Sequence, residues 1–380
     1  MKKKILILGA GLVGRPMALD LMSDGSFEVA VADISEAQLN SLGDESIDRI
    51  KADLSDENTL KSLVRDYDII LNAVPGSIGF RTLKWCIETR KDVIDIAFYP
   101  EDPFDLSELA KTNQVKVICD IGVAPGMSNM LTGYAAHQLD HVSKVDIYVG
   151  GLPKVRTKPW EYKAVFSPTD VIEEYTRPAR LVEHKNIVTK PALTEIELLE
   201  FENVGTLEAF NSDGLRSLMF TIEADMMREK TLRYPGYAEK IKLLSDNGFF
   251  NPEVVDVSGQ QVSPLEMTSK LLFDQWKLQT GEVDVTVMRI TAEGEKNGES
   301  LRYQFDLYDE YDPITGIHSM ARTTGYTATM AVRLLDKGLF STIGITVPEF
   351  LGKDQKVVDF MLDGLKKRGV VYKSSVNKIS

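Results

Sequence analysis

The first 21 residues contain the pattern that most constrains how this chain can fold. The apolar run Ile5-Leu6-Ile7-Leu8 leads into Gly9-Ala10-Gly11-Leu12-Val13-Gly14, and a helix-compatible segment continues from Arg15 to Leu21. A strand, a G-x-G-x-x-G loop and a helix in this order are typical of a dinucleotide site. The first glycine permits the tight turn, the second lets the backbone approach the pyrophosphate, and the third lets the helix pack against the strand. The loop residues that we expect to bind the dinucleotide are Gly9, Gly11, Leu12, Val13 and Gly14.

The next strand-like segment supplies the second half of this signature. It runs from Glu28 to Ala32 and ends at Asp33, about 20 residues after the glycines, where a carboxylate accepts hydrogen bonds from the ribose of NAD. An acid repels a 2′-phosphate, and Ile34-Ser35-Glu36 supplies no cation. We therefore predict NAD as the cofactor, with NADP the less suitable one. The alternative is that the glycines only form a tight turn and Asp33 begins the next loop.

Apolar strand-like segments alternate with helix-like ones as far as residue 125, which predicts an α/β fold with a doubly wound parallel (Rossmann) sheet. Ligands of such sheets bind at the carboxyl ends of the strands. Two further strands end in polar or breaker residues, at Asp53 and at the segment that begins with Asn72. The residues at these ends that we expect to contact the cofactor are Asp53, Asn72, Ala73 and Val74.

The pattern changes after Gly126. Residues 283–290 and 301–308 alternate with a period of two, which is typical of half-exposed antiparallel strands, and the turn-like residues 294–298 between them indicate a hairpin. A later helix-like segment begins at Gly325. We therefore predict a second, α+β mixed-sheet substrate domain over residues 126–324, with residues 1–125 and about 325–380 forming the dinucleotide-binding domain.

Composition excludes several classes of function. The net charge of −13 argues against binding to nucleic acid or to anionic membranes. No apolar run of about 20 residues occurs, and the one behind Lys2 to Lys4 is too short for a signal peptide, so we expect a cytoplasmic protein. Cys86 and Cys119 have no partners at metal-ligand spacing, and we predict no metal site and no disulfide framework.

Three segments resemble the saccharopine dehydrogenase family. They are residues 120–129 (DIGVAPGMSN), 149–153 (VGGLP) and 229–240 (EKTLRYPGYAEK), in this order behind the glycine loop. The resemblance covers nearly the whole chain. It implies a Rossmann domain, a mixed-sheet substrate domain and nicotinamide-linked oxidation at a carbon that bears nitrogen. In the first segment it implies cofactor contacts at Val123, Pro125 and Gly126.

Within this family the chain most resembles the lysine 6-dehydrogenases. The saccharopine enzymes carry an Asp where Ala124 stands and an Arg where Thr169 stands, and both belong to recognition of the glutamate half of saccharopine. Loss of both favours a free amino acid or another amine as substrate. Tyr237, however, stands where the lysine enzymes have His. Two alternatives remain: a saccharopine dehydrogenase, and a non-catalytic, NAD-sensing Rossmann protein.

The resemblance and the predicted strand ends together suggest roles for side chains around the reacting carbon. Arg233 is the expected anchor for a substrate carboxylate, with a structural salt bridge as the alternative. Asp120 and Asp95 both end strands, and either is a candidate proton acceptor unless it only caps the next turn. The aromatic residues expected to line or wall the site are Phe98, Tyr99, Tyr234 and Tyr237. The alternatives are ordinary loop packing for Phe98 and Tyr99 and a tyrosine corner that stabilises the turn for the other two. The expected partner is a small amino acid or amine, and a homo-oligomer is expected by family analogy.

Overall fold

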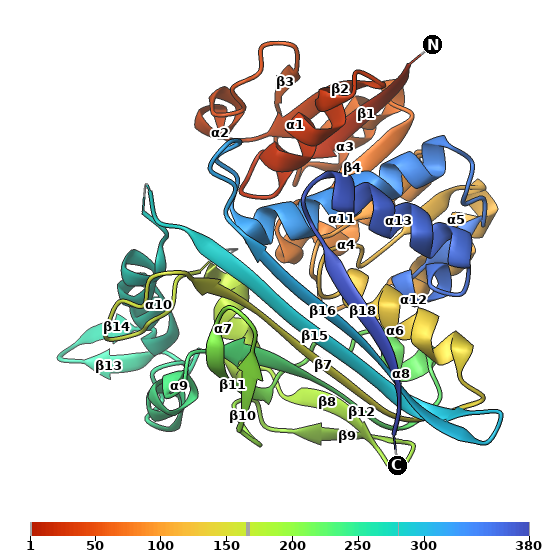
Figure 1. Cartoon of the computed structure of the whole chain (residues 1–380). Coiled ribbons are helices and arrows are strands. Elements are labelled where there is room, and N and C mark those ends of the chain that lie inside the picture. Colours follow the sequence, from red (N-terminus) through yellow and green to blue (C-terminus); the bar gives the residue numbers. More distant parts are fainter. Residues whose placement is uncertain (1, 165–167, 280, 380) are drawn as a thin grey trace. The chain divides into compact units, whose positions relative to one another are not determined.

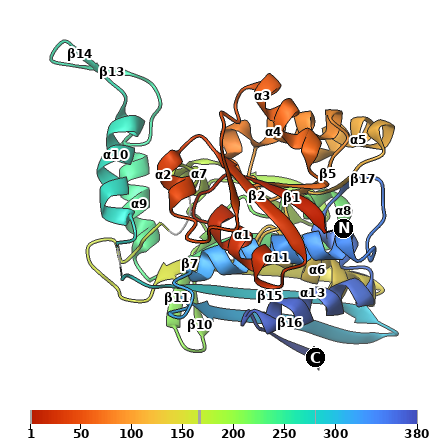
Figure 2. The same cartoon turned by 90° about the horizontal axis from the view of Figure 1, so that it is seen from above.

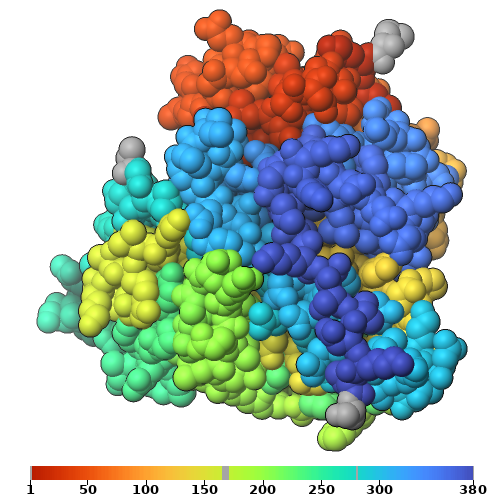
Figure 3. Space-filling view, viewed as in Figure 1, coloured from red at the N-terminus to blue at the C-terminus, as the bar shows by residue number. Residues whose placement is uncertain are grey.

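The computed structural model describes residues 2–164, 168–279 and 281–379. Contacts divide the chain into two compact units (Figures 1 and 3). Unit 1 contains residues 1–137 and 321–371, and unit 2 contains residues 138–320 and 372–380. Each unit therefore contains two stretches that lie far apart in the sequence.

Unit 1 is built around a seven-stranded sheet in which every strand pair is parallel. Its order is β17-β6-β5-β4-β1-β2-β3, which is the Rossmann order with one added edge strand. The strands are β1 (Lys3–Leu8), β2 (Phe27–Asp33), β3 (Asp48–Lys51), β4 (Ile69–Asn72), β5 (Asp92–Asp95), β6 (Lys116–Ile118) and β17 (Gly344–Thr346). The predicted doubly wound parallel sheet is confirmed.

Helices connect and cover these strands (Figure 1). They are α1 (Gly14–Ser23), α2 (Glu36–Asn40), α3 (Glu57–Leu63), η1 (Val64–Asp66), α4 (Gly76–Glu88), η2 (Pro103–Leu106), α5 (Ser107–Asn113), α6 (Met127–Gln138), α11 (Ser319–Asp336), α12 (Pro348–Leu351) and α13 (Gln355–Lys367). The central strand β1 is fully buried from Ile5 to Leu8. Helices cover both faces of a parallel sheet, so an inner strand needs apolar side chains on both of its faces. This burial explains why the run reads as continuously hydrophobic in the sequence.

Unit 2 contains a mixed nine-stranded sheet, which confirms the predicted second fold class. The main path is β10-β11-β12-β7-β15-β16-β18; β7 and β12 are parallel, and the other pairs on this path are antiparallel. The strands are β7 (His141–Pro153), β8 (Ala179–Glu183), β9 (Asn186–Lys190), β10 (Glu197–Phe201), β11 (Gly205–Asn211), β12 (Ala224–Arg233), β15 (Asp284–Lys296), β16 (Glu299–Glu310) and β18 (Tyr372–Lys378). Strands β15 and β16 form the predicted hairpin, and positive φ angles at Asn297 and Gly298 suit its two-residue turn.

A smaller helical group belongs to the same unit. Its members are α7 (Pro168–Thr176), α9 (Tyr237–Asp246), α10 (Pro264–Trp276) and the two-stranded hairpin of β13 (Val255–Val257) and β14 (Gln260–Val262), whereas α8 (Leu218–Thr221) lies apart from them near β12 (Figure 1). Helices α9 and α10 lie at the margin of unit 2, with the hairpin beside them (Figure 2). Their inner faces share an aromatic core with Tyr162, Tyr175 and Phe210.

The unit boundaries differ from the predicted domain boundaries in two places. Helix α6 belongs almost entirely to unit 1, although the prediction started the second domain at residue 126. The last strand, β18, belongs to unit 2, although the prediction assigned every residue after 325 to the first domain. It pairs antiparallel with β16 from Leu301 opposite Lys378 to Leu307 opposite Tyr372. The end of the chain belongs to unit 2 because β18 forms hydrogen bonds with the edge of β16, and no local sequence pattern predicts this long-range pairing.

Among the described residues, no helix has both the length and the apolar character that crossing a bilayer requires.

Candidate functional site

The glycine loop between β1 and α1 has the geometry that each glycine requires. Gly9 has φ of 107°, and a Cβ there would lie 2.7 Å from the carbonyl oxygen of Ala73. A Cβ on Gly14 would lie 1.9 Å from the carbonyl oxygen of Gly9, so only glycine lets α1 start this close to the strand. No atom lies within 4 Å of a Cβ built on Gly11. The second glycine therefore offers open space at its backbone, as a pyrophosphate would need.

The carboxylate of Asp33 organises this loop. Its Oδ2 accepts a hydrogen bond from the Ala10 amide at 2.8 Å, and its Oδ1 accepts one from the Ser35 amide at 2.7 Å. The side chain of Leu12 lies at the loop tip and is 58% exposed, while Val13 is half-buried. Asp33 thus lies beside the glycines, as a ribose-binding acid would, and it also holds the backbone of the loop in place.

The end of β4 lies next to the same loop. The Ala73 amide donates to the Leu8 carbonyl at 2.9 Å, which continues the pairing of β4 with β1. Val74 is only 5% exposed and packs in the core of unit 1, so its side chain is structural and only its backbone remains available to a cofactor. Asp53, by contrast, is exposed at the end of β3, and its Oδ1 accepts from both the amide and the hydroxyl of Ser55. Those hydrogen bonds hold the pKa of Asp53 below its usual range.

Asn72 and Asp95 form a buried polar pair at the ends of β4 and β5. The Asn72 side-chain amide donates to Oδ1 of Asp95 at 3.1 Å and to the Gly79 carbonyl at 3.3 Å. The Ala97 amide donates to the same carboxylate at 2.8 Å, and the Tyr99 hydroxyl donates to its Oδ2 at 3.2 Å. Burial raises the pKa of Asp95 to about 7; the charge of Asp120 adds to this, and the hydrogen bonds oppose it. The side chain is therefore able to hold or release a proton near neutral pH.

The loop after β6 carries the remaining residues predicted in unit 1. Asp120 is 4% exposed and has φ of 53°, so it is a buried acid held in a left-handed backbone conformation. Val123 is buried, and Pro125 accepts from the Gly122 amide through its carbonyl at 3.0 Å. A Cβ on Gly126 would lie 1.8 Å from the Gly122 carbonyl oxygen, which closes the loop tightly before α6.

The two aromatic residues predicted to wall the site after β5 differ in their burial. Phe98 is half-buried. Tyr99 is 1% exposed, and its ring packs edge-on against Phe80 with 5.5 Å between ring centres. This ring belongs to the hydrophobic core of unit 1 and its hydroxyl donates to Asp95, as loop packing would require; its place in the wall of a substrate pocket stays a prediction.

Unit 2 holds Arg233 in an aromatic cage. The guanidinium carbon lies 4.5 Å from the ring centre of Tyr162, 5.9 Å from that of Tyr175 and 5.8 Å from that of Tyr237. Nη2 donates to Oε2 of Glu174 at 2.8 Å and to the Tyr175 hydroxyl at 3.1 Å. Nε is buried and has no hydrogen-bond partner among the described residues. A buried guanidinium with one unused donor fits an acceptor that is not part of the chain.

Of the two predicted tyrosines, Tyr237 belongs to this cage and Tyr234 does not. The hydroxyl oxygens of Tyr237 and Tyr175 lie 2.9 Å apart, and burial raises the pKa of Tyr237 well above its usual range, so the group stays a neutral phenol. The ring of Tyr234 stacks under Arg156, and its hydroxyl donates to the Pro153 carbonyl at 3.0 Å. These contacts connect Tyr234 to the end of β7 and fit the structural alternative for this residue; its place in the substrate pocket stays a prediction.

The sequence reasoning missed most partners of Arg233. Tyr162, Glu174 and Tyr175 lie outside the three family segments, and no local pattern marks them as partners of Arg233; Thr169, to which the resemblance assigns a role, has a side chain outside the described residues. Another missed group is Glu229, which accepts from the Ser212 hydroxyl at 2.7 Å. Burial raises the pKa of Glu229 to about 8, against the lowering effect of that hydrogen bond.

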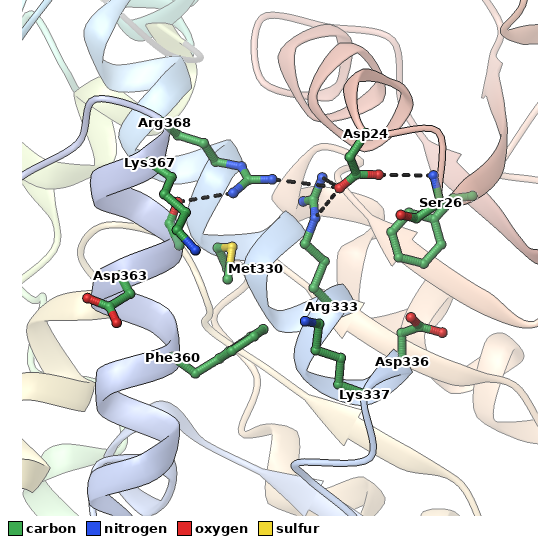
Figure 4. A pocket seen from close by; sticks show the side chains of 12 residues that line it. Asp24, Ser26, Met330, Arg333, Asp336, Lys337, Phe360, Asp363, Lys367 and Arg368 are labelled. Carbon is green, nitrogen blue, oxygen red and sulfur yellow. Dashed lines mark hydrogen bonds and ion pairs between the residues drawn. The ribbon is translucent and has the colours of Figure 1, made fainter.

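A cavity of about 460 Å³ in unit 1 does not belong to these groups (Figure 4). It lies between the end of α1 and helices α11 and α13, at the amino ends of the parallel strands. Two arginines line it, but Arg333 bonds to Asp20 at 2.7 Å and to Asp24 at 2.9 Å, and Arg368 bonds to Asp20 at 2.6 Å. Both guanidinium groups are thus already paired with carboxylates, and this cluster connects α11 and the end of α13 to α1. In the described ranges, no three His, Cys, Asp or Glu side chains are arranged to hold a metal ion.

Known proteins resemble the chain over its whole length. Residues 5–118 match the model of the saccharopine dehydrogenase NADP binding domain, and residues 122–370 match the model of the saccharopine dehydrogenase C-terminal domain. The first relatives include alpha-aminoadipic semialdehyde synthase of Arabidopsis thaliana, 26% identical over 71% of this chain and 29% of that protein. Saccharopine dehydrogenase (NADP(+), L-glutamate-forming) of Pyricularia oryzae is 26% identical over 71% of this chain and 63% of its own length. The chain spans less than two thirds of the length of these relatives.

A solved structure shares the complete fold. Apo saccharopine dehydrogenase (L-Glu forming) from Saccharomyces cerevisiae superimposes with a TM-score of 0.82, at 19% sequence identity, over 99% of this chain and 100% of that one. The two family models together account for both units, and the C-terminal model alone covers more than half of the chain. The chain belongs to the saccharopine dehydrogenase family.

Proposed function

We propose that this protein is a nicotinamide-dependent oxidoreductase that acts on the C–N bond of an amino acid, with saccharopine as the best-supported substrate. The observation that carries the proposal is the match of both units to the two saccharopine dehydrogenase models, together with a buried arginine whose Nε lacks a partner. The names of the relatives from Pyricularia oryzae and Saccharomyces cerevisiae support saccharopine more than they support lysine.

The glycine loop fits a dinucleotide. Gly11 leaves open space at its backbone, Gly9 and Gly14 admit no side chain, and the carboxylate of Asp33 lies beside them. When bound, the nicotinamide ring would accept or supply a hydride. The chain's own part is to hold the pyrophosphate at the start of α1 and the adenosine ribose near Asp33.

The choice between NAD and NADP rests on two opposed observations. The matched family model and the fungal relatives are named for NADP. In this chain Asp33 adds a negative charge, and the cation of Lys51 at the end of the neighbouring strand is paired with Glu36 at 3.0 Å. We infer from the charges that NAD binds more tightly than NADP, and titration with each dinucleotide tests this directly.

Arg233 is the proposed anchor for a substrate carboxylate. Glu174 is its present carboxylate partner and has a 28% exposed side chain, so a substrate carboxylate would compete with Glu174 for the same guanidinium. The three tyrosine rings fix the plane of the guanidinium, and fixed orientation favours bidentate recognition. The alternative, that Arg233 and Glu174 form only a structural ion pair, predicts that substrate binding does not depend on Glu174.

The proton acceptor is proposed among the two buried acids of unit 1. Asp95 has a pKa near neutral pH, but its side chain is fully buried and bonded to Asn72, Ala97 and Tyr99. We therefore assign it a positioning role, in which its proton state sets the charge at the end of β5. Asp120 is the proposed residue for direct proton transfer, because it lies in the loop after β6 as a buried acid that is 4% exposed, whereas Asp95 is fully enclosed.

Lysine remains a second candidate substrate because of two residues. Ala124 and Thr169 stand where the saccharopine enzymes have an Asp and an Arg that recognise the glutamate half. A chain that lacks both would bind saccharopine more weakly than those enzymes do.

Kinetic assays separate these candidates. The purified chain is incubated with saccharopine, lysine and related amines, each with NAD and with NADP, and the reduced nicotinamide is followed by absorbance. Saturable oxidation of saccharopine supports the proposal, and oxidation of lysine alone supports the second candidate. Dinucleotide binding without turnover of any of these amines would favour the non-catalytic sensor and contradict both.

A further inference from the structure

Helix α11 is enclosed along nearly its whole length, and the covering is incomplete at Thr324. Every residue from Ser319 to Leu335 is buried except Thr324, which is half-buried. A helix on a protein surface exposes one face along its whole length, whereas an enclosed helix exposes none. One exposed position in an otherwise enclosed helix therefore marks a local gap in what covers it.

The part of α11 around this gap belongs to unit 1 and packs against two of its loops. A Cβ built on Gly325 would lie 2.9 Å from Cγ of Met17 and 3.4 Å from Cγ1 of Val13, so the helix lies against the glycine loop and the first turn of α1 (Figure 2). A Cβ built on Gly122, in the loop after β6, would lie 3.1 Å from Cγ2 of Thr324. The gap at Thr324 therefore lies beside both loops.

Both loops follow the carboxyl ends of parallel strands, where a dinucleotide binds in sheets of this kind. The glycine loop is the expected place of the pyrophosphate, and Asp33 at the end of β2 is expected at the adenosine ribose. The sheet order has β2 on one side of β1, and β4, β5 and β6 on the other. A dinucleotide that runs from Asp33 across the glycine loop thus points its nicotinamide half toward the loop after β6. Thr324 lies on the side of this half.

We propose that α11 forms a third wall of the dinucleotide site, an inference that rests on the proposed nicotinamide cofactor but not on the identity of the amine substrate. Thr324 lines the space for the nicotinamide half, and Gly325 supports the glycine loop through Val13. Glycine is required at position 325 because a side chain there would press on Met17 and Val13. A helix about 300 residues after the glycine loop thus completes a site that the sequence pattern assigns to N-terminal segments.

Calorimetric titration of the full chain with NAD and with ADP tests the role of Thr324. ADP carries the adenosine and both phosphates of NAD but lacks its nicotinamide half. Thr324→Leu fills the gap with a larger side chain that suits a helix. The dissociation constant of NAD should rise by about tenfold or more, because added bulk has no room in a packed site. That of ADP should stay within about twofold, and its binding also shows that the variant is folded.

Gly325→Ala tests the support of the glycine loop. The added methyl group must displace Met17 or Val13, so NAD and ADP should both bind about fivefold or more weakly. The matched control is Asp336→Leu, which places a leucine at an exposed position of the same helix, about 18 Å from Thr324 along the axis. It should leave both dissociation constants within about twofold of the wild-type values.

The pattern across these variants decides the proposal. Unchanged NAD affinity in Thr324→Leu, an equal loss of NAD and ADP affinity in that variant, unchanged affinities in Gly325→Ala, or an equal effect of Asp336→Leu would each overturn it. If the chain prefers NADP, NADP and 2′,5′-ADP replace NAD and ADP with the same expectations. A chain that shows the expected pattern but oxidises no amine would contradict the proposed function alone, and a wild type that binds neither dinucleotide would contradict both proposals.

Discussion

The glycine loop of unit 1 and the arginine cage of unit 2 are built in opposite ways. The loop is made of backbone: its glycines and amides leave open space at Gly11, and its shape comes from what Gly9 and Gly14 lack. The cage is made of side chains, and Arg233 in it is 2% exposed and already carries a carboxylate partner. The loop has open space beside its backbone, whereas any ligand of the Arg233 guanidinium would have to compete with Glu174.

This difference sets what a mutation can reveal. In the loop, adding one methyl group removes space, so an effect is steric and local. In the cage, removing one group leaves other buried polar atoms without partners, so the effect on binding comes together with a cost in stability. The predictions below use matched variants to separate these contributions.

The largest effect is expected at Gly14. Gly14→Val places a Cβ 1.9 Å from the Gly9 carbonyl, which is backbone and unable to move away, so the start of α1 must shift. We expect a loss of about 4 kcal/mol or more in unfolding free energy and no measurable dinucleotide binding. Denaturant unfolding and calorimetric titration measure the two effects.

Gly11→Ala is the matched control for the loop. Its Cβ meets no atom of the chain within 4 Å, so stability should change by less than about 1 kcal/mol. It does fill the space that a pyrophosphate would occupy, so dinucleotide affinity should still fall. Unchanged affinity in this variant would mean that the dinucleotide does not approach the second glycine.

The next largest effect is expected at Arg233. Arg233→Met keeps the bulk of the side chain but removes its charge, and kcat/KM should fall by roughly 1000-fold, equal to about 4 kcal/mol of transition-state binding. Steady-state kinetics measure this, with thermal unfolding to follow the cost in stability.

Glu174→Gln provides the comparison that the exchange model needs. It weakens the present partner of Arg233 without removing its hydrogen bond, so KM should fall if a substrate carboxylate takes the place of Glu174. An unchanged or higher KM would mean that the pair is structural and that the cage does not receive the substrate.

The contrast also explains what could be predicted from the sequence. The glycine loop, the acid that ends β2 and the parallel character of the sheet follow from patterns within about 30 residues, which is the length of one strand-helix-strand unit. Arg233 and Tyr237 were found through a family motif, but Glu174 is 59 positions away from Arg233 and no periodicity links the two. Tyr99 was predicted as a wall because it follows a strand end, yet its hydroxyl turns back to Asp95, a contact that depends on packing.

A smaller, pH-dependent effect is expected at Asp95. Its pKa is about 7 in the folded chain and near 3.8 when unfolded, so between these values the unfolded chain releases a proton that the folded one keeps. Stability should therefore fall as the pH rises from about 4 to about 7, by at most about 4 kcal/mol, and then level off. Denaturant unfolding at several pH values measures this slope.

Asp95→Asn is the control for that slope. Asn cannot ionise but still accepts from the Ala97 amide, so the variant should lose the pH-dependent part and keep most of the local structure. Equal slopes in the variant and the wild type would assign the titration to another group. Slopes that differ only above pH 7 would contradict a folded pKa near neutrality.

The smallest effect, and the sharpest test of the cradle, is expected at Asp33. Its carboxylate holds the amides of Ala10 and Ser35, and it also supplies the charge proposed to favour NAD. Asp33→Asn removes the charge but keeps one acceptor for the loop. We expect NAD to bind about tenfold more weakly and NADP to bind equally or more tightly, because a 2′-phosphate would no longer meet a negative charge. Calorimetric titration with both dinucleotides measures the two constants. An equal loss for both would mean that Asp33 acts only by ordering the loop, and the backbone cradle alone would then account for binding, with no side chain choosing between the two cofactors.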